Sequence, residues 1–314
     1  MYRIGIDLGG TNIAIGIVDN ENNIVKKGSV PTKAGRNPDE IIKDMALLCN
    51  KLMEEMGILE CQIEKVGIAS PGAIDPKGGI VSRETKLKMV DYPIVKKLKE
   101  YLHIKKIKVE NDANAAAIGE AIAGSGKGVE KFIMVTLGTG VGGGIIIDGK
   151  IYSGFNYAGG ELGHMVIEHN GRPCTCGRKG CWEMYSSATG LINMTKEHMM
   201  TNKESLMWKL VDNDIEKVSG RTAYQAAAMG DMTARAVCAE YTDYLACGLI
   251  NIINIFQPDA IGIGGGVSNE GENLLAPLRE IVDRLQYTNA APKKTELRIA
   301  TLKNDAGIIG AASL

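Results

Sequence analysis

The chain has 314 residues, of which 45% are hydrophobic and 23% charged, and its formal net charge is −1. This is the composition of an ordinary globular protein with room for two domains and a large core. A charge so close to zero gives no global field that recruits nucleic acid or an anionic membrane, so neither is expected as a partner. The Met1 start lacks a secretion signal and no apolar run is long enough to span a bilayer, so we expect a cytoplasmic protein.

The first part of the chain alternates short apolar strands with amphipathic helices. Tight turns join the first three predicted strands, which therefore form a meander. A loop is expected over 71–75. The predicted strands cover 3–7, 13–18, 24–29, 65–70 and 106–110, and the predicted helices cover 38–56, 93–102 and 113–123.

The second part begins like the first. Leu8-Gly9 and Leu137-Gly138 each precede an aspartate, Asp19 or Asp148, by the same interval, and both segments read strand, glycine turn, strand, acidic turn, strand. This weak internal repeat predicts two similarly built domains. The later elements are strands at 132–137, 144–147, 260–263 and 296–301 and helices at 222–229, 231–256, 270–285 and 306–314. The alternation of strands and helices favours an α/β fold with mixed sheets.

One histidine and three cysteines stand in a compact spacing. His164 is followed after nine residues by Cys174, after one more by Cys176, and after four more by Cys181. Three thiolates and an imidazole are a typical ligand set of a tetrahedral structural zinc site. His169 lies inside the same stretch and competes for the imidazole position. The other four cysteines are scattered, and we expect buried free thiols at Cys49, Cys61, Cys238 and Cys247.

Three glycine-rich loops follow predicted strands. Glycine lets backbone N–H groups approach phosphate oxygens, and a neighbouring hydroxyl adds a hydrogen bond. A single loop of this kind is equally well explained by a hairpin turn. Three loops at strand ends instead predict a nucleotide site, although none matches a Walker or dinucleotide-binding motif. The residues concerned are Gly9, Gly10, Thr11 and Asn12, then Gly138, Thr139, Gly140 and Gly142, then Gly264, Gly265 and Gly266.

Two acidic positions at strand ends are candidates for chemistry. Asp7 precedes the first glycine loop, where a carboxylate can hold Mg²⁺ beside phosphates, or can simply cap a turn. Asn111 and Asp112 stand where a strand ends and a helix begins. Both residue types are favoured helix caps, and a carboxylate in this position is also well placed as a general base toward a substrate hydroxyl.

The chain resembles the ROK-family sugar kinases over nearly its whole length. The motifs that carry the resemblance occur in the family's order, and the cysteine block followed by Glu183 is most similar to the family's bacterial ATP-dependent glucokinases. They read IGIDLGGTNIAIGIVD, ENDANAAAIGEA, LGTGVGGGIIIDGK, GGELGH, CTCGRKGCWE and IGIGGGVS.

The resemblance implies an actin-like (ribonuclease H-like) ATPase fold of two α/β domains with a central cleft. The smaller domain would comprise residues 1–112 and about 301–314, and the larger one residues 113–300 with the zinc loop 164–181. The implied activity is transfer of phosphate from ATP, with Mg²⁺, to the 6-hydroxyl of glucose. Kinases of N-acetylglucosamine, N-acetylmannosamine or fructose are the alternatives within the family, and a sugar-responsive repressor is a remote one.

The resemblance also assigns roles to residues. It makes Asp112 the base and assigns the zinc to His164, Cys174, Cys176 and Cys181. It suggests a homodimer or homotetramer. The implied sugar ligands are Gly72, Ala73, Asn111 and Asp112 on one side of the sugar and Glu161, His164 and Glu183 on the other.

Overall fold

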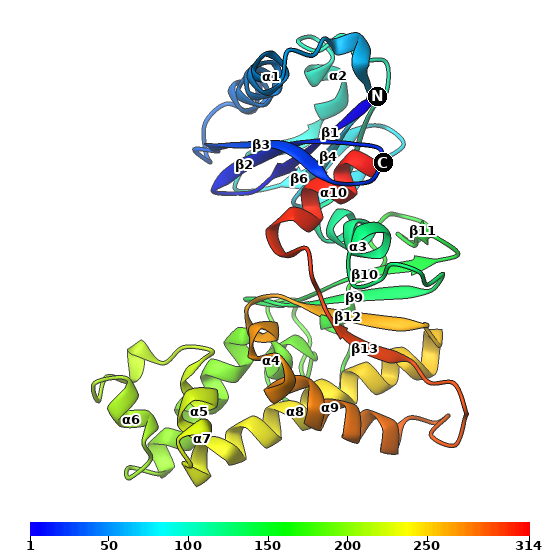
Figure 1. The fold of residues 1–314 in the computed structure, drawn as a ribbon. Coiled ribbons are helices and arrows are strands. Elements are labelled where there is room, and N and C mark those ends of the chain that lie inside the picture. Colours follow the sequence, from blue (N-terminus) through cyan, green and yellow to red (C-terminus); the bar gives the residue numbers. More distant parts are fainter. The chain divides into compact units, whose positions relative to one another are not determined.

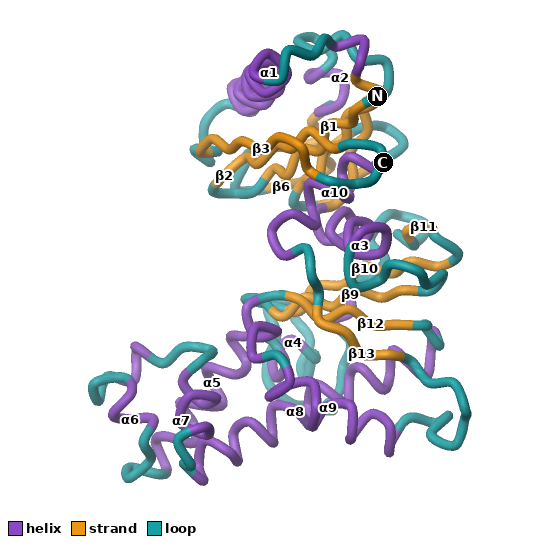
Figure 2. Tube along the Cα trace, viewed as in Figure 1, coloured by secondary structure: helices purple, strands orange, loops and turns teal.

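The computed structural model describes residues 1–314. Internal contacts divide the chain into two compact units (Figures 1 and 2). The first unit contains residues 1–130, 144–160 and 301–314, and the second contains 131–143 and 161–300. The chain therefore leaves the first unit more than once and ends in it.

The strands are short and confirm the α/β character predicted from the sequence. They are β1 (Tyr2–Leu8), β2 (Asn12–Val18), β3 (Ile24–Pro31), β4 (Ile63–Ser70), β5 (Ala73–Asp75), β6 (Ile80–Glu84), β7 (Met89–Tyr92), β8 (Ile107–Asn111), β9 (Phe132–Leu137), β10 (Val141–Ile147), β11 (Lys150–Ile151), β12 (Ala260–Gly264) and β13 (Glu296–Ile299).

The helices range from a single turn to the 25-residue α8. They are α1 (Pro38–Glu55), α2 (Ile94–Leu98), α3 (Asp112–Ala123), α4 (Glu183–Ser186), α5 (Ala188–Thr201), α6 (Met207–Leu210), α7 (Thr222–Ala228), α8 (Met232–Phe256), α9 (Glu272–Leu285) and α10 (Ala306–Ser313). No helix is both long and apolar enough to cross a membrane.

The two five-stranded sheets share one topology, which bears out the internal repeat. The first has the order β3-β2-β1-β4-β8 and the second β11-β10-β9-β12-β13. In the first sheet β1 pairs antiparallel with β2 and parallel with β4, which pairs parallel with β8. In the second, β12 pairs parallel with both β9 and β13. An opening hairpin followed by parallel crossovers is thus used twice.

The first sheet is covered on both faces because successive side chains of a strand point to opposite sides. Ile4, Ile6 and Leu8 of β1 pack in the core that also contains Ile41 of α1 and Leu98 of α2. The opposite face of the same strands is covered by α10, which Figure 1 shows in red across the sheet from α1. This arrangement places α3 and α10 together on one side of the sheet.

Glycines allow α10 to pack against its neighbours backbone to backbone. A Cβ atom at Gly5 of β1 or Gly67 of β4 would overlap backbone atoms of α10, at Ile308 and Ala311 respectively. A Cβ atom at Gly310 of α10 would in turn overlap the carbonyl group of Ala115 in α3. The small residues of α10 therefore fix it tightly between the sheet and α3.

Several elements differ from those predicted. The segment 71–92 forms a third sheet, with the order β5-β6-β7, where the sequence predicted a loop at 71–75 and no strands. These strands have only three to five residues, and each contains a charged residue, so their periodicity is weak. The helix predicted at 93–102 is the shorter α2. A 3₁₀ helix over Gly266–Glu270 precedes α9, which begins at Glu272 and not at Glu270.

Candidate active site and metal centre

Three candidate segments lie at one edge of the first sheet. β1, β4 and β8 run parallel, Asp7 pairs with Ala69, and Ser70 pairs with Asn111. The carboxyl ends of parallel strands share one edge, where ligands of open α/β sheets bind. The first glycine loop, the loop at Gly72 and the beginning of α3 therefore emerge side by side. The sequence predicted each of these segments separately, and the fold brings them together.

Asn111 links two of these segments. Its side chain caps α3 by accepting hydrogen bonds from the backbone N–H groups of Ala113 (2.9 Å) and Asn114 (3.2 Å). Its Nδ2 atom also donates to the carbonyl oxygen of Gly72, at 3.2 Å. The amide thus acts as the helix cap that its residue type favours and holds the Gly72 loop against the end of β8.

Asp112 is the first residue of α3, and its side chain remains accessible to solvent. Its Oδ1 atom accepts a hydrogen bond from the backbone N–H of Ala113, at 2.9 Å. Partial burial nevertheless raises the pKa of Asp112 above the ordinary aspartate value, and the charge of Glu84 raises it further. A carboxylate with a raised pKa is a stronger base than an ordinary aspartate, so this one is suited to accepting a proton.

Asp7 is the second carboxylate of this edge. Burial, together with the charge of Asp112, raises the pKa of Asp7 to about 6, although Lys27 opposes the shift. Its carboxylate lies against Gly307 of α10, where a Cβ atom would stand 2.8 Å from Oδ2. The charge of Asp112 thus disfavours a second negative charge at Asp7, and a bound cation would relieve this repulsion, so magnesium at Asp7 stays a prediction.

The first glycine loop is held in a fixed conformation. The backbone N–H of Gly9 donates to the carbonyl of Asn12 at 2.9 Å, and the hydroxyl of Thr32 donates to the carbonyl of Gly9 at 2.6 Å. The Thr32 N–H donates to the carbonyl of Thr11 at 2.8 Å. Gly10, Thr11 and Asn12 are exposed, so their N–H groups can reach a ligand.

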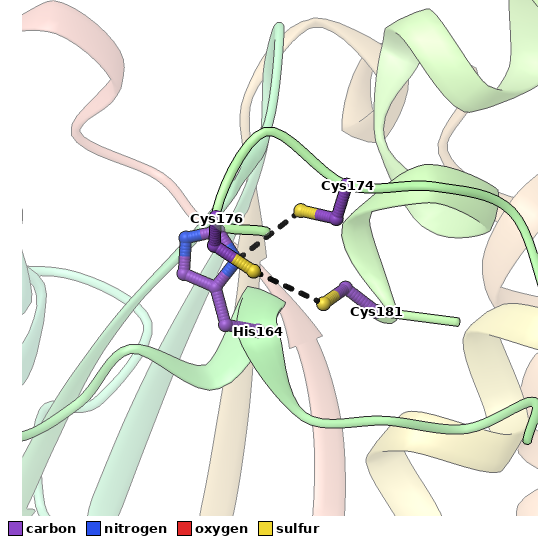
Figure 3. Close-up of side chains that lie close together, drawn as sticks. All are labelled: His164, Cys174, Cys176 and Cys181. Carbon is purple, nitrogen blue, oxygen red and sulfur yellow. Dashed lines mark hydrogen bonds between the residues drawn. The ribbon is translucent and has the colours of Figure 1, made fainter. Parts of the chain in front are cut away.

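In the second unit the structure gathers the predicted zinc ligands into one cluster. One ligand atom from each of His164, Cys174, Cys176 and Cys181 lies within 4.8 Å of all the others (Figure 3). His164 comes from a 3₁₀ turn at Leu162–His164 and the cysteines from the loop that follows. His169, the competing imidazole, is exposed and is not part of the cluster.

The distances in the cluster fit a zinc ion. The Sγ atoms of Cys176 and Cys181 are 3.6 Å apart, and the Sγ atom of Cys174 is 3.6 Å from Nδ1 of His164. A tetrahedral ion with Zn–S bonds of about 2.3 Å and a Zn–N bond of about 2.0 Å separates its ligands by about 3.8 Å (S to S) and 3.5 Å (S to N). A disulfide needs only about 2 Å between sulfurs. The donor set and its spacing therefore match a closed structural zinc site.

The two predicted carboxylates of this unit flank the cluster. Oε1 of Glu183 accepts a hydrogen bond from the Cys174 thiol at 3.1 Å and lies 3.5 Å from Nδ1 of His164. Oε2 of Glu161 lies 3.9 Å from Nε2, the other ring nitrogen of His164. The imidazole thus has one nitrogen toward the metal ligands and one toward Glu161. A metal held by His164 would in this way also orient both carboxylates.

The second glycine loop lies beside the metal centre. A Cβ atom at Gly140 would stand 2.6 Å from Oε2 of Glu183, so glycine leaves room for that carboxylate. The carbonyl of Gly138 accepts the N–H of Ala188 at 2.8 Å, and the carbonyl of Thr139 accepts the Thr189 hydroxyl at 2.8 Å. The loop is therefore fixed to the beginning of α5.

The third glycine loop is adjacent to the second because it follows the neighbouring parallel strand. Gly264 of β12 pairs with Thr136 of β9. Gly265 has a positive φ of 87°, and a Cβ atom there would overlap the backbone of Leu137. Gly266 is exposed and has open space around it. The second and third loops therefore emerge from neighbouring strands at the carboxyl edge of β9 and β12, and Gly142 lies on β10, which follows the second loop.

The sequence did not single out two acidic residues of the first site. Glu110 precedes Asn111 and is only 5% exposed, and Glu84 lies on β6, which was not predicted at all. A buried carboxylate next to a strand-to-helix junction has no periodic signal of its own. One other expectation was wrong in part: among the scattered cysteines Cys49 is buried, but Cys238 and Cys247 are half-buried and Cys61 is exposed.

Comparisons with known proteins give a consistent result. The model of the ROK family matches residues 3–314. A glucokinase of Halalkalibacterium halodurans is 36% identical over 311 residues, which cover 98% of this chain and 93% of the relative. The xylose repressor of Bacillus subtilis is 28% identical, with 100% of this chain and 76% of the repressor covered.

A solved structure is similar over the whole chain as well. It is a ROK-family glucokinase from Streptomyces griseus in complex with glucose and AMPPNP, with a TM-score of 0.78 and 33% identity. The match covers 100% of this chain and 98% of that one. The family model and the relative above 30% identity both extend over nearly all residues. This chain belongs to the ROK family.

Proposed function

We propose that the protein is an ATP-dependent glucokinase, which transfers the γ-phosphoryl group of ATP to the 6-hydroxyl of glucose. The observation that carries the proposal is the accessible carboxylate of Asp112, with its raised pKa, at the carboxyl edge of the first sheet. Support comes from a glucokinase 36% identical over nearly the whole chain and from a similar glucokinase structure that holds glucose and AMPPNP.

Asp112 is the proposed general base. It takes the proton of the sugar's 6-hydroxyl while that oxygen forms a bond to the γ-phosphorus, and the bond from this phosphorus to the β–γ bridging oxygen breaks to release ADP. Oδ1 of Asp112 accepts a hydrogen bond from the Ala113 N–H, which orients the carboxylate. A base of this kind contributes about 10²–10⁴-fold to the rate.

The remaining sugar contacts are proposed from the same resemblance and fit the chemistry of the residues. Hydroxyl groups need both acceptors and donors, which carboxylates, an amide and backbone groups supply. In the first unit, Asn111, Asp112 and the Gly72-Ala73 backbone would bind the side of the sugar near O3, O4 and O6. In the second unit, Glu161, His164 and Glu183 would bind the side near O1 and O2.

The glycine loops are the proposed phosphate and nucleotide contacts. Gly10, Thr11 and Asn12 are exposed in the first unit and Thr139 and Gly266 in the second, so their N–H groups are the proposed phosphate donors. Asp7 would hold Mg²⁺ directly or through water. The ion supplies charge neutralisation on the transferred phosphoryl group, which is most of what this chemistry requires.

The zinc is proposed to be structural. Four protein ligands close its coordination sphere and leave no position for substrate. Its role is to hold His164, Glu161 and Glu183 in their mutual geometry.

We also propose a domain division, a cellular location with the partners it excludes, and an oligomeric state. The functional domains are residues 1–112 with about 301–314, and residues 113–300. The protein works in the cytoplasm without nucleic-acid or membrane partners. It forms a homodimer or homotetramer.

The test is a coupled assay of ADP release with glucose, mannose, fructose, N-acetylglucosamine and N-acetylmannosamine at saturating ATP. We expect the highest kcat/KM for glucose. A higher value for an N-acetylhexosamine or fructose would reassign the substrate within the family. Sugar binding without ADP release from any of them would instead indicate a binding protein such as the related repressor.

A further inference from the structure

One buried carboxylate next to the proposed base has no assigned role. Glu110 is the penultimate residue of β8, it is 5% exposed, and it has no ion-pair partner. Burying a carboxylate without a cation is costly unless hydrogen bonds compensate, so the contacts that it makes indicate what it is retained for.

We infer that Glu110 is a positioning residue, whose carboxylate fixes the strand-to-helix turn that carries Asn111 and Asp112. The inference rests on the proposed function, because it assumes that these two residues bind and activate the sugar. Glu110 itself is not proposed to touch the substrate.

The contacts of Glu110 all go to this turn. Its Oε1 atom accepts a hydrogen bond from the backbone N–H of Asn111 and another from Nδ2 of Asn114, each at 3.0 Å. Asn114 is 4% exposed, so the second bond is shielded from water. One oxygen therefore ties the last residue of the strand to the first turn of the helix. Hydrogen bonds to an ionised acceptor are about twice as strong as neutral ones.

These contacts reach the reacting groups in one further step. Asn111 caps α3 through the N–H groups of Ala113 and Asn114, and its Nδ2 holds the carbonyl of Gly72. The same Ala113 N–H donates to Asp112. If the backbone of Asn111 moved, the cap, the Gly72 contact and the Asp112 carboxylate would move with it. Displacement of a catalytic group by about 1 Å can cost on the order of a hundredfold in rate.

A second buried carboxylate on the same helix provides the contrast. Glu120, near the other end of α3, is 0% exposed and accepts hydrogen bonds from Ser125 N–H (2.7 Å), Ser125 Oγ (2.9 Å), Thr301 N–H (3.2 Å) and Leu302 N–H (2.7 Å). None of its partners is a proposed site residue. Glu120 thus anchors the connection to α10 and serves stability, whereas Glu110 serves the site.

The experiment compares two matched substitutions, each of which removes one side-chain hydrogen bond to a buried glutamate of this region. Asn114→Ala removes one side-chain hydrogen bond to Glu110, and Ser125→Ala removes one to Glu120. Glu110→Ala and Glu110→Gln complete the set, since glutamine keeps an Oε1 acceptor without the charge. For each variant we would measure the melting temperature, glucose binding by calorimetry, and kcat and both KM values well below the melting temperature.

We expect Glu110→Ala to lose at least about tenfold in kcat, with a raised KM for glucose and an unchanged KM for ATP. Glu110→Gln should recover part of this loss, and Asn114→Ala should show a smaller loss of the same kind. Ser125→Ala should lower the melting temperature while kcat and both KM values stay at the wild-type values. If Glu110→Ala does not fold, Asn114→Ala and Glu110→Gln decide.

The inference is overturned if Asn114→Ala and the Glu110 variants change only the melting temperature, as Ser125→Ala does, or if the KM for ATP rises with that for glucose. The proposed function has a separate test in the wild-type protein, and the absence of ADP release with every hexose would refute it.

Discussion

For Asp112 the sequence predicted either a helix cap or a general base. It is a favoured residue at the beginning of a helix, and it is also an accessible carboxylate whose pKa is raised by partial burial and by Glu84. The capping function belongs to its neighbour Asn111, whose side chain accepts two backbone N–H groups. Asp112 accepts the Ala113 N–H through Oδ1 and is the proposed base.

The first prediction concerns this carboxylate. Asp112→Asn should keep the fold and glucose binding and lose at least about a hundredfold in kcat, because asparagine has the same shape but cannot take the proton. Discontinuous assays with long incubation times would measure the residual turnover, and calorimetry would measure the binding of glucose. Turnover close to that of the wild type would remove Asp112 as the base.

The second prediction is a pH dependence. The base is active when deprotonated, so activity is lost as the pH falls through its pKa. Because this pKa is raised, the loss should begin at a higher pH than for an ordinary aspartate. Glu84→Gln removes a negative charge that raises the pKa of Asp112, so it should move the acid limb of kcat/KM to lower pH. Glu64→Gln, on β4, serves as the control and should leave the limb in place.

At the scale of single elements, α10 is held by the absence of side chains. Gly5, Gly67 and Gly310 let backbone meet backbone between α10, the sheet and α3. Glycines give a terminal helix a low intrinsic helix propensity. Their contribution to close packing can be recognised only when the neighbouring elements are known.

The third prediction tests this packing. Gly310→Ala places a Cβ atom into the carbonyl group of Ala115, so α10 or α3 must shift, at a cost of about 3 kcal/mol or more in the free energy of unfolding. Gly220→Ala is the matched control, because open space surrounds that position and its φ is ordinary. Urea unfolding of both variants gives the comparison. Equal free energies of unfolding for the two variants would mean that α3 and α10 can move apart without loss of stability.

The zinc loop is the second element whose rigidity matters. Arg172 ties this loop to Tyr185 of α4: the Tyr185 hydroxyl accepts the Arg172 N–H at 2.7 Å, and the Arg172 guanidinium lies 5.0 Å from the centre of the Tyr185 ring. Trp182 is fully buried, and its indole N–H donates to the carbonyl of Tyr244 in α8. The loop is thus anchored on one side by packing and on the other by its metal ligands.

The fourth prediction follows from this division. Protein purified without chelators should contain zinc, and Cys176→Ser should lose it and raise the KM for glucose by disordering Glu161, His164 and Glu183. Cys61→Ser removes an exposed thiol that is not part of the cluster and should change neither zinc content nor KM. Metal analysis and steady-state kinetics provide both readouts. An unchanged KM in zinc-free Cys176→Ser would contradict the coupling.

At the scale of the whole molecule, one topology is used twice. Both five-stranded sheets consist of an antiparallel hairpin, a further strand beyond it, and two parallel strands on the other side. The glycine loops at the first turn of each sheet occupy corresponding positions, after β1 and after β9. This repetition explains why a glycine loop follows the first strand of each sheet.

The fifth prediction applies to the folded chain as a unit. A ligand that binds only the native state raises its stability by mass action, by about 2.7 kcal/mol at a hundred times its Kd. Glucose at that concentration should therefore raise the melting temperature, and Asp112→Asn should show the same gain because binding is retained. Sorbitol at equal concentration should have no effect. A gain with sorbitol as large as with glucose would indicate a nonspecific solvent effect.

The sequence by itself determined the local features. Alternating apolar residues predicted most of the strands, the cysteine spacing predicted the metal ligands, and the repeat at Leu8-Gly9 and Leu137-Gly138 predicted the duplicated topology. All three patterns involve residues close together in the chain, where geometry follows from spacing alone. The motifs were specific enough to indicate the family before any fold was known.

Only the tertiary structure decided which residues meet across long separations. The spacing alone permitted His164 or His169 as the imidazole ligand, and the structure confirms the choice of His164 that the family resemblance implied. It built a sheet from the weak segment 73–92 and brought Glu84 near Asp112. It buried Glu110, whose carboxylate accepts the backbone N–H of Asn111. Burial and pairing depend on distant segments, so a local pattern carries no record of them.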